Sequence, residues 1–334
     1  MIITADNHMG AGRRRSATLR MMFYKAFAKF LEHCEQTYSP DEIIVVAGDC
    51  FDTAEPRPGE YTLVQDILGK YRKQKKIFIP GNHDNVLADG ISAIDVLSEC
   101  PNVQIQTSPI SFEHCGKRFS LLPVSANMFD LMRTMKPADV LISHFGTNQM
   151  SYFAGVIDEE DEVFQKFQKV ILGDIHTNYH SPDRKFWTTG ATYYCKINEM
   201  LNNKASYLYL NDETLEVRRV LLTDVDPIFT VEVITSEDEA LDSERMYVLY
   251  GDKQANKPNI LVYNRIVETS APEGVAEVQH STIAEESFTL DSFVSTFLKD
   301  VLPERDRLLV VQLAKGEIDE TEFVENILSV EEGI

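Results

Sequence analysis

The chain has 334 residues, of which 43% are hydrophobic and 25% charged, a composition typical of a folded globular protein rather than a disordered or fibrous one. The length predicts about two domains. No apolar run approaches the ~20 residues that a bilayer requires, Asp6 interrupts the first apolar segment, and the five cysteines form no C-x-x-C pair. We therefore expect a reduced, cytoplasmic protein that does not enter a membrane.

The net charge of −21 argues, taken alone, against a nucleic-acid partner, because phosphate binding depends on Lys and Arg. The acidity is concentrated in the last third of the chain, where residues 223–334 hold 25 acidic and 8 basic side chains. Basic residues cluster earlier, at Arg13, Arg14 and Arg15 and again over 70–76. These patches could hold phosphate groups or could be solvated helix ends.

Short apolar segments alternate with helical patterns over the first 222 residues. Strands are predicted over 1–5, 42–47, 77–80, 139–143, 169–173, 207–210 and 215–222, and helices over 18–38, 59–73 and 91–100. A β-rich stretch over 103–124 contains a plausible turn at Cys115-Gly116. Because the strands are rich in Val, Ile and Leu, they suit sheets covered on both faces, and the sequence predicts a layered α/β domain over 1–222.

The pattern changes after Pro227. Three strand-like runs predict a small α/β second domain over 223–269, and residues 270–288, with Pro, Gly, Ser and Glu, predict a flexible linker. Three helical segments are predicted within a C-terminal helical tail over 289–334. Apolar residues such as Phe293 and Phe297 could form a face for a partner or pack onto their own protein.

Five polar clusters each follow directly after a predicted strand. They read Asp6-Asn7-His8, Gly48-Asp49, Gly81-Asn82-His83-Asp84, Ser143-His144 and Gly173-Asp174-Ile175-His176. Loops that leave the carboxyl ends of strands converge on one edge of an α/β fold, so we expect these clusters to form one site. Carboxylate, imidazole and carboxamide groups suit Mn²⁺ or Fe²⁺ better than thiolate sites would, and a pair of metal ions is the natural occupant.

The clusters suggest a role for each residue. Asp49 is our candidate bridge between the two ions. One ion is predicted to take Asp6, His8 and His176, and the other to take Asn82, His144 and Asp174. His83 is left without a metal and becomes the candidate general acid at the scissile phosphate, with Asp84 orienting its ring.

In this order the clusters resemble the calcineurin-like metallophosphoesterase superfamily, whose pattern is D-x-H, G-D, G-N-H-D or G-N-H-E, H, and G-H-x-H. The length, the continuation Asp49-Cys50-Phe51-Asp52 and the predicted tail are similar to SbcD-type nucleases that process DNA double-strand breaks, above all to short phage-encoded members. The resemblance implies a four-layer αββα core, two Mn²⁺ ions with Mg²⁺ as a substitute, and exonuclease activity on duplex DNA with endonuclease activity on single strands. It also implies a homodimer that binds an SbcC-type coiled-coil ATPase through its C-terminal helices, in DNA recombination and repair.

One position departs from the family pattern, because Asp174 stands where an imidazole is usual. With Asp6 and Asp49 it sets three carboxylates against two divalent ions, and we predict a preference for Mn²⁺ or Mg²⁺ over Zn²⁺. The residues Arg13 to Arg15 are the candidate DNA contact, which would hold the backbone without reading bases. Two alternatives stay open: a phosphatase or phosphodiesterase for a smaller ester, or a binding scaffold whose metal site has decayed.

Overall fold

The computed structural model describes residues 1–12, 17–85, 92–150, 157–240, 242–243, 245–250 and 255–263. The chain divides into a compact unit Met1–Ile266 and a second unit Val267–Ile334. The predicted linker 270–288, the predicted helical tail 289–334 and the arginines at 13–15 lie outside the described residues. In the part of the chain that is described, no helix has both the length and the apolar content to cross a bilayer.

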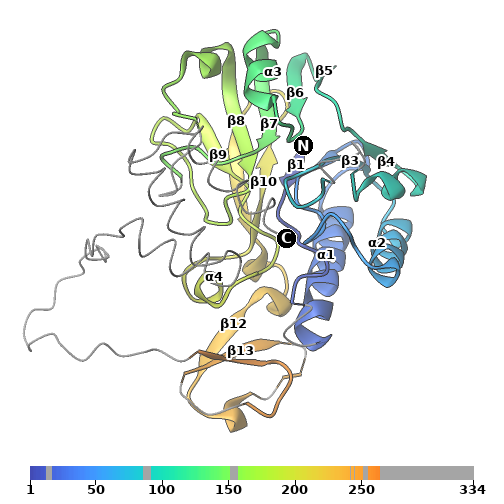
Figure 1. Cartoon of the computed structure of the whole chain (residues 1–334), viewed down its shortest axis with the longest axis vertical. Helices are drawn as coiled ribbons and strands as arrows, with labels where there is room; N and C mark the ends of the chain where they lie inside the picture. The colour runs from blue at the N-terminus through green and yellow to red at the C-terminus, as the bar shows by residue number, and fades with distance from the viewer. Residues whose placement is uncertain are drawn as a thin grey trace, which may run out of the picture. The chain divides into compact units, whose positions relative to one another are not determined.

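The first sheet has six strands in the order β11-β10-β1-β2-β3-β4, and Figure 1 labels β1, β3, β4 and β10 among them. Its strands are β1 (Ile2–Thr4), β2 (Ile43–Ala47), β3 (Lys75–Ile79), β4 (Val103–Ile105), β10 (Ser206–Leu210) and β11 (Val217–Leu221). Strands β1 to β4 run parallel, whereas β10 is antiparallel to β1 and to β11. The helices α1 (Ala17–Thr37) and α2 (Pro58–Lys70) bury their apolar faces in one cluster with this sheet.

The second sheet has five strands in the order β5-β6-β7-β8-β9. They are β5 (Ile110–His114), β6 (Lys117–Leu122), β7 (Ala138–His144), β8 (Phe167–Gly173) and β9 (Phe186–Thr188). The turn predicted at Cys115-Gly116 joins β5 to β6, with positive φ angles of 49° and 72°. Helix α3 (Met128–Thr134) and a 3₁₀ turn (Glu162–Lys166) share an apolar cluster with the outer face of this sheet.

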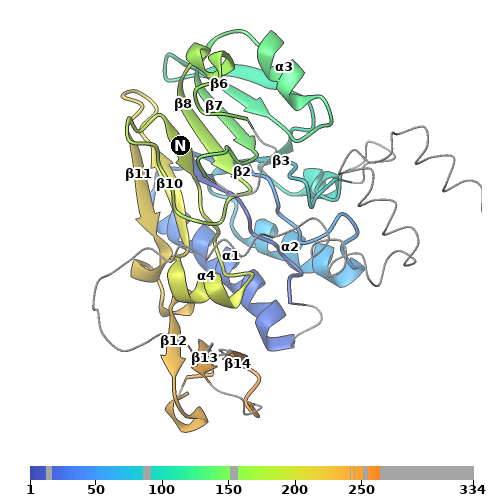
Figure 2. The same ribbon diagram turned by 60° about the vertical axis from the view of Figure 1, so that its left-hand side comes forward.

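Alternation along the central strands stacks the two sheets face to face. In β2, Ile44 and Val46 belong to the cluster that contains α1, whereas Val45 lies in a second cluster with Ile142 of β7. Successive residues of a strand point to opposite faces, so each sheet buries both of them. The result is the predicted four-layer αββα sandwich, with α1 and α2 on one side and α3 on the other (Figure 2).

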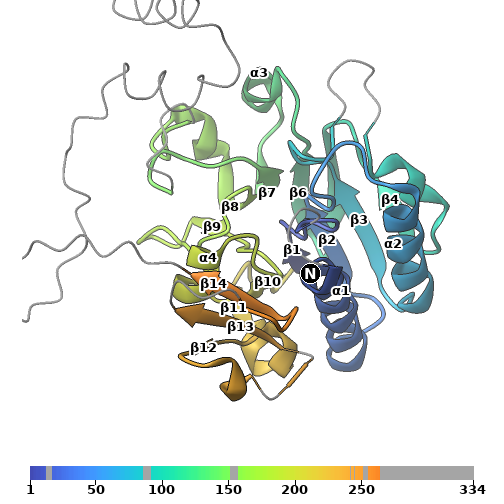
Figure 3. The same ribbon diagram turned by 60° about the horizontal axis from the view of Figure 1, so that its bottom comes forward.

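A third, smaller sheet holds the three strands predicted after Pro227. The parallel strands β12 (Val231–Ile234), β13 (Met246–Tyr250) and β14 (Ile260–Tyr263) follow one another in order (Figure 3). Met246 and Val248 join the same apolar cluster as α1, while Tyr247 and Leu249 form a separate small core. This sheet therefore packs against the sandwich through one face of β13.

Some short elements differ from the sequence prediction. The segment predicted as a helix over 91–100 forms only a 3₁₀ turn, Asp95–Glu99. The elements α3, β9 and α4 (Ile197–Asn202) were not predicted. Each has seven residues or fewer, which is too short for a clear apolar period.

Candidate metal centre

The structure places all five polar clusters at the carboxyl ends of strands, as the sequence suggested. Asp6 and His8 follow β1, Asp49 follows β2, and Asn82 follows β3, all parallel strands of the first sheet. In the second sheet the parallel strands β7 and β8 supply the rest: His144 ends β7, and Asp174 and His176 follow β8. Because the sheets are stacked, the ends of both meet at one edge of the sandwich.

The backbone at this edge turns sharply. Asp6, His8, Asp49 and Asp174 have φ angles of 53°, 43°, 51° and 76°. The left-handed region costs a non-glycine residue about 1–2 kcal/mol, and such strain tends to gather at functional sites. Four of the seven predicted ligands thus hold a conformation that their residue type disfavours.

Glycines allow the loops to approach one another closely. A Cβ atom at Gly48 would overlap the His144 ring, and one at Gly81 would overlap the Asp49 carboxylate. Gly48 also has a φ of 95°, which glycine alone adopts readily. Gly48 and Gly81, which precede the predicted ligands Asp49 and Asn82, therefore make room for a ligand of a neighbouring loop.

Asp49 lies at the centre of the cluster. Its Oδ2 atom is 3.3 Å from His144 Nε2 and 3.7 Å from His8 Nε2. Its Oδ1 atom accepts a hydrogen bond from the backbone N–H of His83 at 2.9 Å. One carboxylate thus stands between imidazoles of the two predicted ligand groups, which is the placement that a bridging ligand needs.

The first predicted group, Asp6, His8 and His176, is closely packed. His8 Nε2 lies 3.1 Å from His176 Nε2, and Asp6 Oδ1 lies 3.6 Å from His176 Nε2. The side chain of Asp6 is fully buried, and its Oδ2 atom has no hydrogen-bond partner within the described part of the chain. A buried carboxylate oxygen without a donor is costly, and a bound cation would satisfy it.

The second predicted group, Asn82, His144 and Asp174, contacts Asp49 through His144. His144 Nε2 is 3.1 Å from Asn82 Oδ1 and 4.0 Å from Asp174 Oδ1. The backbone N–H of Asp174 donates to Asp6 Oδ1 at 3.2 Å and so ties the two groups together. The carboxylate that replaces the usual imidazole therefore still reaches the cluster.

Two of the imidazoles are oriented by acceptors on their far side. His144 Nδ1–H donates to the carbonyl oxygen of Ala47 at 2.7 Å, and His176 Nδ1–H donates to Glu199 Oε1 at 3.1 Å. Since both partners are acceptors, the Nδ1 atoms carry hydrogens and the Nε2 atoms face the cluster, where a metal ion would take the place of their protons. This arrangement is typical of histidines that ligate metals.

The charges of the cluster call for a cation. Burial alone would raise the pKa of Asp49, but the neighbouring His144 more than offsets this and holds the pKa well below its ordinary value. Burial would lower the pKa of His144, yet the carboxylates of Asp49, Asp6 and Asp174 raise it to about 10. The buried carboxylates thus draw positive charge into the site, and divalent ions would supply it. The donor set of carboxylate, imidazole and amide fits such ions.

His83 lies at the open side of the cluster. Its side chain is 43% exposed, and its Nε2 atom lies 4.0 Å from Asp49 Oδ2. Its ring meets the His8 ring edge to face, with centroids 5.0 Å apart. His83 Nδ1 lies 2.9 Å from the backbone carbonyl of Asp52, which orients the ring.

Asp84 does not orient the ring of His83, contrary to our expectation. Its fully buried carboxylate accepts hydrogen bonds from the backbone N–H groups of Gly81, Cys50 and Phe51 at 3.0, 3.2 and 2.9 Å. Burial, with the nearby Asp49, raises the pKa of Asp84 to about 6. Asp84 therefore joins the loops that follow β2 and β3, and the carbonyl of Asp52 takes the role that we had assigned to it.

Three residues of the site were missed in the sequence. Glu199 of α4 holds His176, and Asp52 lies with its Oδ1 atom 3.4 Å from His8 Nδ1. The Sγ atom of Cys195 and ring nitrogens of His8 and His176 all lie within 4.8 Å of one another. Of these three, only Asp52 could have been found from the sequence, because it is the last residue of the family-like continuation Asp49-Cys50-Phe51-Asp52.

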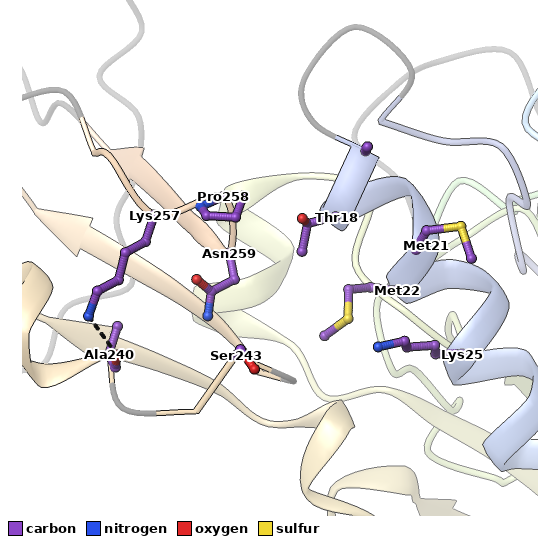
Figure 4. A pocket seen from close by; sticks show the side chains of 10 residues that line it. Thr18, Met21, Met22, Lys25, Ala240, Ser243, Lys257, Pro258 and Asn259 are labelled. Atoms are coloured by element: carbon purple, nitrogen blue, oxygen red, sulfur yellow. Dashed lines mark hydrogen bonds between the residues drawn. The ribbon is translucent and has the colours of Figure 1, made fainter.

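A cavity of about 690 Å³ lies apart from this cluster, between α1 and the small sheet. Its lining includes Met21, Met22, Lys25, Lys257 and Asn259 (Figure 4). None of the predicted site residues lines it. The chemistry indicated by the sequence is therefore at the edge of the sandwich and not in this cavity.

Comparison with known proteins adds a family model and several solved structures. A model described as calcineurin-like phosphoesterase matches residues 1–188. A structure titled as a novel archaeal phosphodiesterase is 14% identical, with a TM-score of 0.36, over 66% of this chain and 98% of its own. The phosphopantetheinyl hydrolase of Mycobacterium tuberculosis is 13% identical, with a TM-score of 0.38, over 66% of this chain and 95% of its own.

Proposed function

The chain belongs to the calcineurin-like phosphoesterase family of metal-dependent hydrolases, and we propose that it is a Mn²⁺-dependent DNA nuclease of the SbcD type. The observation that carries the proposal is the placement of Asp52 beside two imidazoles. Its side chain lies 3.4 Å from His8 Nδ1, and its carbonyl lies 2.9 Å from His83 Nδ1. The sequence Asp49-Cys50-Phe51-Asp52, one of the features on which the likeness to these nucleases rests, is thereby part of the site.

The proposed centre holds two Mn²⁺ ions. Asp49 would bridge them, with Asp6, His8 and His176 on one and Asn82, His144 and Asp174 on the other. A pair of divalent ions polarises a phosphodiester and stabilises both its attacking and its leaving oxygen. The phosphate would enter beside His83 and Asp174, since their side chains are 43% and 37% exposed.

His83 is the proposed general acid. In its protonated form the ring keeps Nδ1–H on the Asp52 carbonyl and presents Nε2–H toward the reacting phosphate. Transfer of that proton to the leaving oxygen neutralises the charge that develops when the bond breaks. The ring nearest to His83 is that of His8, at a centroid separation of 5.0 Å, so the acid lies next to the first ion group.

Three further parts of the proposal concern partners. Arg13, Arg14 and Arg15 would contact the DNA backbone, since they follow the loop of Asp6 and His8 within a few positions of the chain. The predicted helices of 289–334 would bind an SbcC-type coiled-coil ATPase. The nuclease would act as a homodimer.

The test is cleavage of labelled linear duplex and single-stranded DNA by the purified full chain with Mn²⁺. We expect cleavage of both substrates, which Asp49→Ala and His83→Ala abolish and a chelator stops. His180→Ala, a histidine outside the cluster, is the matched control and is expected to cut normally. Undiminished cleavage by Asp49→Ala would remove the proposed centre, and hydrolysis of a small phosphodiester without DNA cleavage would favour the smaller-substrate alternative.

A further inference from the structure

We propose that Cys195 gives the first ion position a sulfur ligand, so that this position also takes a thiophilic cation such as Zn²⁺, which then inhibits the enzyme. The inference rests on the proposed metal centre and adds a means of regulation to it. Cys195 belongs to none of the five polar clusters of the sequence, and its place in the site comes from the structure alone.

Three donors of the right chemistry lie together. The Cys195 sulfur and ring nitrogens of His8 and His176 lie within 4.8 Å of one another, and the two Nε2 atoms are 3.1 Å apart. Asp6 adds a fourth donor, because its Oδ1 atom lies 3.6 Å from His176 Nε2 and 3.9 Å from His8 Nε2. Two nitrogens, one sulfur and one oxygen make a set that suits tetrahedral Zn²⁺.

Two further observations support the site independently of the thiol: a buried oxygen of Asp6, and the contacts of Glu199 with both Cys195 and His176. The Oδ2 atom of the fully buried Asp6 has no hydrogen-bond partner in the described ranges, and a bound cation would satisfy it. Glu199 accepts the backbone N–H of Cys195 on Oε2 at 2.8 Å and Nδ1–H of His176 on Oε1 at 3.1 Å. One carboxylate thus fixes the cysteine and the imidazole relative to each other.

The two kinds of ion would use this position differently. Mn²⁺ prefers oxygen and nitrogen donors and leaves the thiol protonated, whereas thiolate ligands select Zn²⁺. Binding through sulfur requires the thiol to release its proton to solvent. Asp6, His8, His176 and Cys195 would fill a tetrahedral Zn²⁺ and leave no position for Asp49 or for substrate, which is the property of a structural zinc site and not of a catalytic one. Zn²⁺ held by Cys195 would therefore stop turnover.

Absorption spectra of the Co²⁺-loaded full chain test the inference, since Co²⁺ takes zinc sites and shows a near-ultraviolet charge-transfer band when a thiolate binds it. We expect this band together with the visible bands of bound Co²⁺, and we expect Cys195→Ser to lose the near-ultraviolet band alone. Cys115→Ser is the matched control, because the exposed Cys115 lies near His114 and Asp212 in a second group of possible ligands.

Each other outcome is decisive. Visible bands without a near-ultraviolet band in the wild-type protein would overturn the sulfur ligand and leave the proposed nuclease standing. Loss of the band in Cys115→Ser would place the thiolate elsewhere and overturn it as well. Failure of the protein to bind Co²⁺ at all would remove the proposed metal centre together with the inference. In cleavage assays with Mn²⁺, the Zn²⁺ concentration that halves activity is expected to rise about tenfold or more in Cys195→Ser.

Discussion

The two sheets contribute unlike halves to the candidate metal centre. The side chains of Asp6 and Asp49, from the first sheet, are 0% and 2% exposed, whereas those of Asp174 and His176, from the second sheet, are 37% and 18% exposed. The first-sheet loops are also tied to each other by backbone hydrogen bonds, including those from Asp6 to Gly48 and from His8 to Asp49. The first half is therefore fixed by the fold itself.

The second half combines the buried His144, which is held by Ala47 and Asn82, with the more exposed Asp174 and His176. Asp174 is linked to the first half by one backbone hydrogen bond to Asp6, and His176 is held on its far side by Glu199. This second half of the centre also contains Asp174, which departs from the family pattern, and Cys195. Ligand identity can change where few contacts depend on it, so this half is the place to look for differences in metal preference.

The largest effect is expected from removing the metal. Burial would lower the pKa of His144 and of His176, but neighbouring carboxylates raise both to about 10, against 6.5 for a free histidine. The metal-free folded protein thus binds more protons than the unfolded chain between these values, so the stability these groups contribute is complete below pH 6.5 and is lost as the pH rises through about 10.

Calorimetric melting of chelator-treated and Mn²⁺-loaded protein across that pH range measures this effect. We expect the melting temperature of the metal-free protein to fall steadily with rising pH. The loaded protein should show a much smaller decline, because the ions replace the protons. Parallel curves for the two forms would mean that the cluster does not hold the ions.

The next largest effect is expected in the first half of the centre, on the stability of the Asp84→Asn variant. Asp84→Asn replaces one of two acceptor oxygens with an amide group, although three backbone N–H groups point at this side chain. At least one of them loses its acceptor, at a cost of about 1–3 kcal/mol in the free energy of unfolding. Urea denaturation measures the change, with Asp66→Asn on the exposed face of α2 as a control expected to stay within about 0.5 kcal/mol of wild type. Equal stability of the two variants would show that Asp84 does not hold these loops.

A smaller effect is expected in the second half from Glu199→Gln. The substitution keeps an acceptor for His176 but removes the negative charge that makes its imidazole a better ligand, and we expect about 10–100-fold weaker Mn²⁺ binding. Titration calorimetry measures the affinity, with Glu213→Gln on the surface as the control. Unchanged affinity in both variants would mean that α4 only covers the site.

The sequence predicted the layers of the fold and the residues that come together at the edge, because both follow from strands of high apolar content with polar clusters directly behind them. It placed Asp49 near His144 without any contact information, since loops that leave the carboxyl ends of strands converge on one edge of such a fold. The glycines at 48 and 81 were part of the same signal, as they make room for the ligands.

What the sequence could not predict are contacts between loops. Asp84 is adjacent to His83 in the chain, yet its side chain accepts hydrogen bonds from backbone N–H groups and does not meet the ring. Glu199 and Cys195 lie on or beside α4, a helix of six residues whose pattern is too short to be recognised. Their roles arise from tertiary packing, which spacing along the chain does not encode.

The smallest effect is expected from restoring the usual imidazole with Asp174→His. In the proposed centre of the wild-type chain three carboxylates would face two divalent ions, and we expect the fastest DNA cleavage with Mn²⁺ or Mg²⁺. The variant removes one negative charge and adds a nitrogen donor, so the ratio of the Zn²⁺-supported rate to the Mn²⁺-supported rate should rise severalfold. Initial rates with each metal measure this ratio. The highest wild-type rate with Zn²⁺ would refute the charge argument.

Because Cys195 also bears on Zn²⁺, the ratio is best compared among Asp174→His, Cys195→Ser and the double variant. Asp174 lies in the second ion group and Cys195 beside the first, and Asp174 is linked to Asp6 through its backbone N–H. If the two positions are independent, the effects of the two single variants on this ratio, expressed as free energies, add up to the effect of the double variant to within about 0.5 kcal/mol. A larger departure would mean that occupation of one position alters the other through Asp6 or Asp49, and that Asp174 and Cys195 together determine which ion the centre accepts.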